Sequence, residues 1–370
     1  MRSHDVIVVG GGVVGCSAAF ALARMGASVL VIERDRIGVH ASRAAAGMLA
    51  PIAESLGEGP AFPMGLESLD LFPALVDEIR ELSGIDPRYT KSGLLRVAEV
   101  SEADALRKRA VILEAHGCEW LDGDELRKRE PRLAPQVVGA LWSPREGHVD
   151  AFLLTRAYAG AAARRGAQLR LGTTVSGLLW EGEGVRGVRT SAGEFYAGDV
   201  VLCSGAWTGL VEDGARLSIH VEPVKGQMIA LEGPAPNLQC IVWGRSCYLV
   251  PRDGSVRVGA TEEHAGFDVR TTAAGISELL TGATRLMPGL GECAFQEAWA
   301  GLRPGTPDQL PLIGPVPGAP GLTVATGHYR NGVLLSALTG LAVADWILAA
   351  KLPPELRACD PARFQRPLCE

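Results

Sequence analysis

The sequence predicts an α/β protein with two domains, one built around a parallel sheet and one around a mainly antiparallel sheet. The chain has 370 residues, which is more than a single domain usually holds. Residues 5–32 have the pattern of a strand, a glycine turn, a helix and a second strand. Later helix and strand patterns are separated by stretches of short strands alone, so we expect the parallel-sheet domain to come from separate segments.

The first segment is a βαβ unit. Residues 5–9 are mostly β-branched and do not alternate, as expected for a strand that is buried on both faces. Residues 13–25 are rich in alanine and leucine and long enough for a helix, which Gly26 is suited to end. Residues 28–32 are again apolar and complete the unit as a second buried strand.

The remaining elements are predicted from the same patterns. Helices are expected at 66–82 with a break near Pro73, at 102–116, at 125–130, at 151–165 and at 332–348, and strands at 91–97, 168–171, 175–179, 185–190, 200–203 and 322–326. Residues 219–295 alternate apolar and polar positions between glycine turns, which indicates antiparallel sheet. We therefore assign residues 1–84, 149–218 and 305–370 to the first domain and residues 85–148 and 219–304 to the second.

Composition argues against a nucleic-acid partner and against a membrane protein. The net charge is −6, and the basic residues are scattered along the chain. No apolar run reaches the roughly 20 residues that a bilayer span needs, and no signal-peptide cleavage pattern follows the first strand. The eight cysteines include no C-x-x-C pair, so we expect reduced thiols and a cytoplasmic protein.

The glycine turn matches a dinucleotide-binding fingerprint. Gly10, Gly12 and Gly15 have the G-x-G-x-x-G spacing between a strand and a helix, where glycines permit a tight turn and close approach to a pyrophosphate. Glu33 ends the next strand, where it can accept hydrogen bonds from both ribose hydroxyls and would repel the 2′-phosphate of NADP. The alternative is a glycine turn without a ligand, and the fingerprint does not separate FAD from NAD.

Three further motifs follow in order along the chain. Residues 38–49 form a loop of small residues, residues 200–207 are an apolar strand followed by a Ser-Gly turn, and residues 327–332 precede the last helix. In this order they resemble the FAD motifs of the D-amino-acid oxidase and glycine oxidase superfamily. Residues 259–268 and 299–304 are particularly similar to the glycine oxidases of thiamine biosynthesis. The resemblance covers essentially the whole chain and implies a Rossmann-like FAD domain of the glutathione-reductase/D-amino-acid-oxidase type.

The resemblance implies a set of FAD-binding residues. These are Gly10, Gly12, Val14, Gly15, Glu33, Arg34, Ser42, Ala46, Gly47, Met48, Val175, Gly205, Trp207, Gly301, His328, Arg330, Asn331 and Gly332. In the neighbouring sarcosine oxidases a cysteine shortly before a Thr-Pro-Asp segment carries the FAD covalently. The Thr306-Pro307-Asp308 segment is present here, but Gly301 stands at the matching position, so we expect non-covalent FAD.

The resemblance also implies a pocket for a small amino acid. Arg303 matches the arginine that binds the substrate carboxylate, a role for which the planar guanidinium is suited. Tyr248 matches a tyrosine that contacts the same carboxylate, and Arg330 and Met48 match residues that line the pocket. The alternatives are a surface arginine at 303 or 330 and core positions for Tyr248 and Met48. His328 is expected to pack or to hydrogen-bond rather than to act as a base.

The implied reaction is transfer of hydride from the substrate Cα to flavin N5. It would give an imine, then a 2-oxo acid and ammonia, with oxygen as the final electron acceptor and hydrogen peroxide as its product. Two alternatives stay open: a D-amino-acid dehydrogenase that passes electrons to a quinone, and a non-catalytic flavin-binding subunit. We expect no metal site, although Glu262, Glu263 and His264 are adjacent, and the family suggests a homotetramer.

Overall fold

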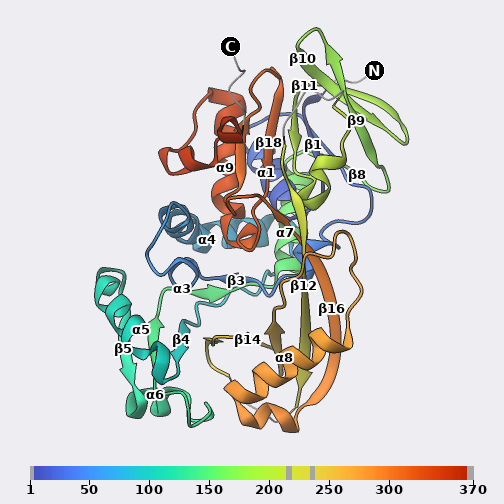
Figure 1. The fold of residues 1–370 in the computed structure, drawn as a ribbon. Helices are drawn as coiled ribbons and strands as arrows, with labels where there is room; N and C mark the ends of the chain where they lie inside the picture. The colour runs from blue at the N-terminus through green and yellow to red at the C-terminus, as the bar shows by residue number, and fades with distance from the viewer. Residues whose placement is uncertain (1–3, 214–218, 234–237, 365–370) are drawn as a thin grey trace, which may run out of the picture.

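The computed structural model describes residues 4–213, 219–233 and 238–364. These residues form two sheets of eight strands each and one separate pair of strands. In Figure 1 the first sheet lies in the upper half of the molecule with both chain ends, and the second sheet lies in the lower half. The predicted fold class, a Rossmann-like domain with a mainly antiparallel second domain, is confirmed.

The first sheet has the order β17-β18-β11-β1-β2-β8, and the β9–β10 hairpin is attached antiparallel to β11. Its strands are β1 (His4–Val9), β2 (Val29–Ile32), β8 (Gln168–Arg170), β9 (Val175–Glu181), β10 (Gly184–Thr190), β11 (Gly193–Leu202), β17 (Leu312–Pro315) and β18 (Leu322–Thr326). Strand β1 pairs in parallel with both β2 and β11, which makes it a central strand. The carboxyl ends of these parallel strands therefore meet at one edge, where ligands bind in such sheets.

Four long helices pack together on this sheet. They are α1 (Val13–Arg24), α4 (Ala61–Ser83), α7 (Ala151–Arg164) and α9 (Gly332–Ala349). Helix α1 contacts α7 and α9, and α4 contacts the same two helices. Among the described residues α9 is the one helix long and apolar enough to cross a bilayer, yet 61% of it is buried inside the protein. Its apolar composition is therefore explained by the core that it fills.

The second sheet has the order β16-β12-β15-β14-β13-β4-β6-β5. Its strands are β4 (Leu94–Ala98), β5 (Glu119–Asp122), β6 (Gly139–Ser143), β12 (Glu222–Glu232), β13 (Ile241–Trp243), β14 (Tyr248–Arg252), β15 (Ser255–Gly259) and β16 (Ala294–Gly305). All neighbours are antiparallel except β4 and β13. Strands β12 and β16 extend toward the first sheet (Figure 1), so their ends can carry side chains to the region between the two sheets.

The remaining strands and helices complete the described part of the chain. They are the strand pair β3 (Met48–Leu49) and β7 (Gly147–His148), helices α2 (Ala41–Ala44), α3 (Pro51–Ser55), α5 (Val100–Ile112), α6 (Gly123–Arg129) and α8 (Ala273–Leu286), and the 3-10 helices Glu114–His116, Gly205–Leu210, Pro288–Glu292, Pro354–Cys359 and Pro361–Phe364. The segment from α2 through β3 to α3 crosses from the first sheet toward the second, and Figure 1 shows this path at β3 and α3.

Two expectations about secondary structure were wrong. Helix α4 does not break at Pro73, because the buried side chains of Phe72, Val76 and Ile79 hold both halves against the core. Residues 219–295 are not sheet throughout, since α8 interrupts them. Thr272 caps that helix by accepting a hydrogen bond from the Gly275 N–H at 3.2 Å. Strand β17 was not predicted.

Candidate active site

A cavity of about 680 Å³ opens between the two sheets. It is lined by every residue expected to bind FAD or substrate except Gly15, namely Gly10, Gly12, Val14, Glu33, Arg34, Ser42, Ala46, Gly47, Met48, Val175, Gly205, Trp207, Tyr248, Gly301, Arg303, His328, Arg330, Asn331 and Gly332. Gly15 lies behind the cavity wall, where a Cβ would stand 2.0 Å from the Gly10 carbonyl oxygen. The glycine at this position allows the helix to pack on the turn.

The fingerprint turn forms one end of the cavity. Gly10 has φ +111°, and a Cβ there would lie 2.5 Å from the Cys203 carbonyl oxygen, so only glycine fits this turn without strain. The Val13 N–H at the start of α1 donates to Ser42 Oγ at 2.9 Å. The buried Glu33 carboxylate accepts hydrogen bonds from the N–H groups of Gly11 (2.6 Å) and Asp35 (2.8 Å). These bonds fix the acid at the tip of β2, beside the turn.

Aromatic and cationic groups stack beside Glu33. The Arg34 guanidinium carbon lies 3.9 Å from the centroid of the Trp207 ring. The centroid of the His40 ring lies 5.0 Å from that of the Trp207 ring, and the centroid of the Phe267 ring lies 5.7 Å from it. Phe267 was not predicted as a site residue, and it brings the segment after β15 to this end of the cavity. A planar heterocycle would find stacking surfaces here.

The small-residue loop is clamped from the second sheet. Arg252 Nη2 on β14 donates to the carbonyl oxygens of Ala46 and Val149, each at 2.9 Å. Trp299 Nε1 on β16 donates to the Ala44 carbonyl oxygen at 3.0 Å. Sequence reasoning missed Arg252 and Trp299 as positioning residues, because both act on backbone that is far away in the chain. They hold the loop against the cavity that it lines.

We expect Arg252→Met to weaken FAD binding about tenfold, because two buried carbonyl oxygens lose their donor and the loop loses its clamp. The measurement is the FAD dissociation constant of the apoprotein, from the quenching of flavin fluorescence. Arg186→Met is the matched control, since Arg186 lies on β10 with its side chain 52% exposed. Equal dissociation constants for the two variants would show that the clamp does not contribute to FAD binding.

The third motif places the N-terminus of α9 at the cavity. Asn331 and Gly332 line the cavity, and the side chain of Asn331, the N-cap residue, makes no hydrogen bond to the first N–H groups of the helix. These groups and the helix dipole favour a partial negative charge at this point. His328 is only 3% exposed, and its Nε2 is hydrogen-bonded with Thr339 Oγ1 at 3.0 Å. Burial lowers the pKa of His328 to about 3, so the ring is neutral and serves packing.

The residues present fit FAD. The cavity is lined by a dinucleotide turn suited to the phosphates and by a fixed acid suited to the ribose. It is also lined by a stacking surface suited to the adenine and by the N-terminus of α9, which suits the flavin. Ser204 Oγ also lines this cavity and is a buried polar atom without a hydrogen-bond partner in the described part of the chain. When bound, FAD supplies a two-electron acceptor for the substrate hydride.

We expect acid precipitation of the protein to release all of the FAD into the supernatant. Gly301 offers no thiol, and a side chain there would collide, since a Cβ would lie 2.4 Å from the Ala44 Cβ. Cys203 and Cys247 line the cavity, but burial raises the pKa of each thiol to about 12, so both are held as unreactive thiols. Flavin absorbance that stays with the washed precipitate would contradict this expectation.

The other end of the cavity carries Arg303 and Tyr248. Arg303 Nη1 on β16 donates to the carbonyl oxygens of Thr261 (3.0 Å) and Lys225 (3.3 Å). The guanidinium lies against Gly226, where a Cβ would stand 2.4 Å from Nη2. Within residues 4–213, 219–233 and 238–364, no carboxylate pairs with Arg303. Its charge is thus available to an anion in the cavity.

Tyr248 begins β14, opposite Trp243 and Gly259. Burial raises the pKa of its phenol, which keeps the hydroxyl protonated and able to donate a hydrogen bond. Glycine at 259 makes room for the ring, because a Cβ there would lie 2.5 Å from the Tyr248 hydroxyl oxygen. Met48 packs in the same cluster as Tyr248 at the start of β3. Both side chains also line the cavity.

Arg330 lies at the cavity but is already paired. Its Nε lies 3.2 Å from Glu54 Oε1 and its Nη1 lies 3.7 Å from Glu262 Oε2. Neither glutamate was predicted as a site residue, and both line the cavity. A sequence signal was present in each case, since Glu54 follows the small-residue loop and Glu262 directly follows the Gly-Ala-Thr of residues 259–261, which resembles glycine oxidases.

Three acidic or imidazole side chains approach one another in the described residues. Glu33, Asp35 and His40 place ligand atoms within 4.8 Å of one another. His40 Nε2 lies 2.7 Å from Asp35 Oδ2, and Glu33 is engaged by two backbone N–H groups. Glu263 pairs with the buried Lys225 at 3.1 Å, away from its neighbours in sequence. Their partners within the protein account for these acids.

The fold and the site define a flavoprotein that acts on an amine or an amino acid. A family model described as FAD dependent oxidoreductase matches residues 5–346. A glycine oxidase of Geobacillus kaustophilus is 40% identical over 93% of both chains, and its crystal structure matches with a TM-score of 0.94, covering 99% of this chain and 100% of that one. The bifunctional protein ThiO/ThiG of Nostoc sp. is 38% identical over 98% of this chain, which spans 56% of that protein.

The chain therefore belongs to the FAD-dependent oxidoreductase family that contains D-amino-acid and glycine oxidases. It is an FAD-dependent amino-acid oxidase, as its sequence predicts.

Proposed function

We propose that this enzyme oxidises glycine and other small amino acids or amines, such as sarcosine and D-alanine. The observation that carries the proposal is the Arg303 guanidinium, which has no carboxylate partner among the described residues and lines the same cavity as the FAD fingerprint, as does Tyr248. Arg303 would bind the substrate carboxylate and Tyr248 would donate a hydrogen bond to it. The similarity to a glycine oxidase along nearly the whole chain supports glycine as a substrate.

The protein's part in the reaction is to bind and orient. With the carboxylate fixed at Arg303, the Cα–H bond is directed toward the end of the cavity where α9 begins. His328 is neutral, buried and bonded to Thr339, so it takes no proton from the substrate amine. The amine must be neutral when hydride leaves, because its lone pair forms the C=N bond of the imine. The resulting imine reacts with water to give ammonia and a 2-oxo acid, and the 2-oxo acid from glycine is glyoxylate. Oxygen takes up the two electrons and two protons and leaves as hydrogen peroxide.

We further propose the physiological setting that the resemblance implies. The enzyme would supply the glycine imine for the thiazole of thiamine in the cytoplasm, and it would work as a homo-oligomer. The ThiO/ThiG relative supports the thiamine role. We also propose residues 1–84, 149–218 and 305–370 as the FAD-binding part and residues 85–148 and 219–304 as the substrate-binding part. Parts of these ranges, residues 1–3, 214–218, 234–237 and 365–370, lie outside the described residues.

The test is a spectrum of the purified protein, first under nitrogen with glycine and then in air. Bleaching of the flavin band by glycine, followed by rapid recovery in air with one hydrogen peroxide released per flavin, is the expected result. A flavin band that glycine, sarcosine and D-alanine all leave unchanged would overturn the substrate assignment. Slow recovery in air, accelerated by a soluble quinone, would instead support the dehydrogenase alternative.

A further inference from the structure

The substrate end of the cavity contains a charge arrangement that the proposed reaction does not require. Glu54 holds Arg330 through two contacts, 3.2 Å from Oε1 to Nε and 3.4 Å from Oε2 to Nη2. Glu262, which follows β15 of the second sheet, approaches the same guanidinium with its Oε2 3.7 Å from Nη1. All three side chains line the cavity. The Arg330 side chain is 37% exposed, but a guanidinium with two carboxylates beside it has less attraction left for an anionic ligand.

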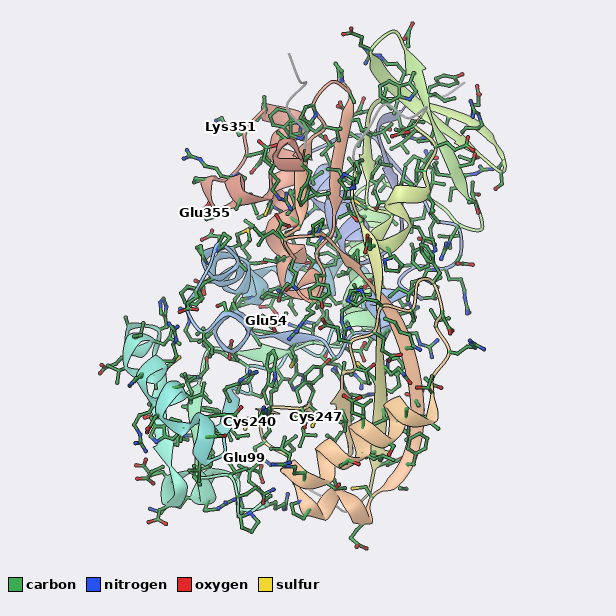
Figure 2. All side chains as sticks on the ribbon, in the orientation of Figure 1. Glu54, Glu99, Cys240, Cys247, Lys351 and Glu355 are labelled. Carbon is green, nitrogen blue, oxygen red and sulfur yellow. The ribbon has the colours of Figure 1, made fainter. Side chains whose placement is uncertain are left out.

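Glu54 is fixed in place by its own helix. It lies on α3, which Figure 2 shows at mid-height in the molecule, between the helices of the first sheet and the strands of the second. The N-terminus of α3 is held by the buried Glu146, whose Oε1 accepts hydrogen bonds from the N–H groups of Ile52 (2.7 Å) and Ala53 (2.9 Å). The carboxylate of Glu54 is therefore presented to Arg330 by a short element that is anchored from behind.

Glu262 also lies near Tyr329. Burial, together with the nearby Glu262 carboxylate, raises the pKa of Tyr329 to about 12. The Tyr329 hydroxyl therefore stays protonated and adds no negative charge beside Glu262. With both acids in place, the charges of Arg303 and Arg330 are matched by those of Glu54 and Glu262. One substrate carboxylate is bound at Arg303, and a second anionic group would meet the two glutamates.

We propose that Glu54 and Glu262 make this pocket selective for substrates with a single carboxylate and reject ligands that carry a second anionic group. The proposal rests on the proposed function, since it concerns which amino acids Arg303 receives. The acids act by repulsion, which discriminates between ligands of the same shape but different charge. Arg330 serves to hold the two acids rather than to bind a second carboxylate.

Besides Arg303 and Arg330, the cavity is lined by Arg34 and Arg36, which follow β2, and by Arg245. Arg245 lies in the turn between β13 and β14 and is exposed to solvent. Charges in water are strongly screened, so we expect Arg245 to contribute little to the binding of a second carboxylate. Arg245 is the alternative binding partner for a second carboxylate, so the test includes the variant Arg245→Ala.

The test compares malonamate with malonate, two acids of the same size that carry one and two negative charges near neutral pH. Their dissociation constants are measured on the holoenzyme, from the change that each causes in the visible spectrum of the flavin and from competition with glycine. We expect the wild type to prefer malonamate. Glu54→Gln with Glu262→Gln should shift the ratio toward malonate by about tenfold, with the larger share from Glu54, because its side chain is 23% exposed while that of Glu262 is 46% exposed and therefore more strongly screened. Turnover of D-asparagine and D-aspartate should change in the same direction.

Glu67→Gln with Glu292→Gln is the control, since it removes two exposed acids that do not line the cavity. The single variant Glu262→Gln, at a side chain 46% exposed, keeps the test open if the double variant folds poorly. Wild-type affinities within about twofold of each other, or an active-site variant with the ratio of the control, would overturn the proposal. The proposal would also be overturned if the wild type preferred malonate and Arg245→Ala no longer bound it, because Arg245 would then bind the second carboxylate. If glycine is not oxidised but the acids bind as expected, the proposed function falls and the charge selectivity stands.

Discussion

Arg303→Met is expected to lower kcat/KM for glycine about 10³-fold while the flavin spectrum of the purified protein stays the same. The reason is that no carboxylate among the described residues pairs with Arg303, whose guanidinium is held against Gly226 by the carbonyl oxygens of Lys225 and Thr261. A substrate carboxylate that loses a charge-assisted partner in a desolvated site loses about 4 kcal/mol of binding. The measurement is steady-state oxygen consumption with glycine, together with the FAD content.

Two variants make this result specific. Arg303→Lys keeps the charge but not the planar pair of donors, so we expect a smaller loss of about 10- to 100-fold. Arg107→Met removes an arginine from α5 whose side chain is 56% exposed, and its activity should match the wild type. A loss below about tenfold in Arg303→Met would mean that another group holds the carboxylate.

Gly47→Ala is expected to abolish FAD binding and to lower the free energy of unfolding by about 2–5 kcal/mol. Gly47 has φ +84°, and a Cβ there would lie 1.9 Å from the carbonyl oxygen of Val149. That oxygen also accepts the hydrogen bond from Arg252, and the Gly47 carbonyl oxygen accepts one from the Val149 N–H at 2.9 Å. The clash therefore separates the small-residue loop from Val149 and from the side chain of Arg252, which position it.

Gly84→Ala separates the two causes of this loss. Gly84 has φ +71° at the end of α4, with nothing within 4 Å of an added Cβ. It carries the conformational cost alone, about 1–2 kcal/mol, and should leave the FAD dissociation constant unchanged. Thermal unfolding and FAD titration of both variants make the comparison. Similar FAD affinities for the two would show that the contact between Gly47 and Val149 is not needed for the FAD site.

Much of the fold could be predicted because its signals are local. The strand β1, the helix α1 and the strand β2 agree with the expected segments to within one or two residues. Buried parallel strands are continuous apolar runs, and a glycine turn followed by a helix has a spacing that the backbone imposes. The break expected at Pro73 failed for a non-local reason, since α4 is held on both sides of the proline by packing against α7 and α9.

The sequence by itself determined the FAD fingerprint at Gly10, Gly12 and Gly15, the acid at Glu33 and the candidate carboxylate site at Arg303. The fingerprint and the acid follow from residue type and short spacing, which the chain carries wherever it folds, whereas the role of Arg303 follows from the resemblance to glycine oxidases. Only the tertiary structure decided the state of Arg330, because Glu54 lies 276 positions away from it in the chain. An ion pair depends on distance in space and on desolvation, and neither can be read from the order of residues when the partners come from different elements.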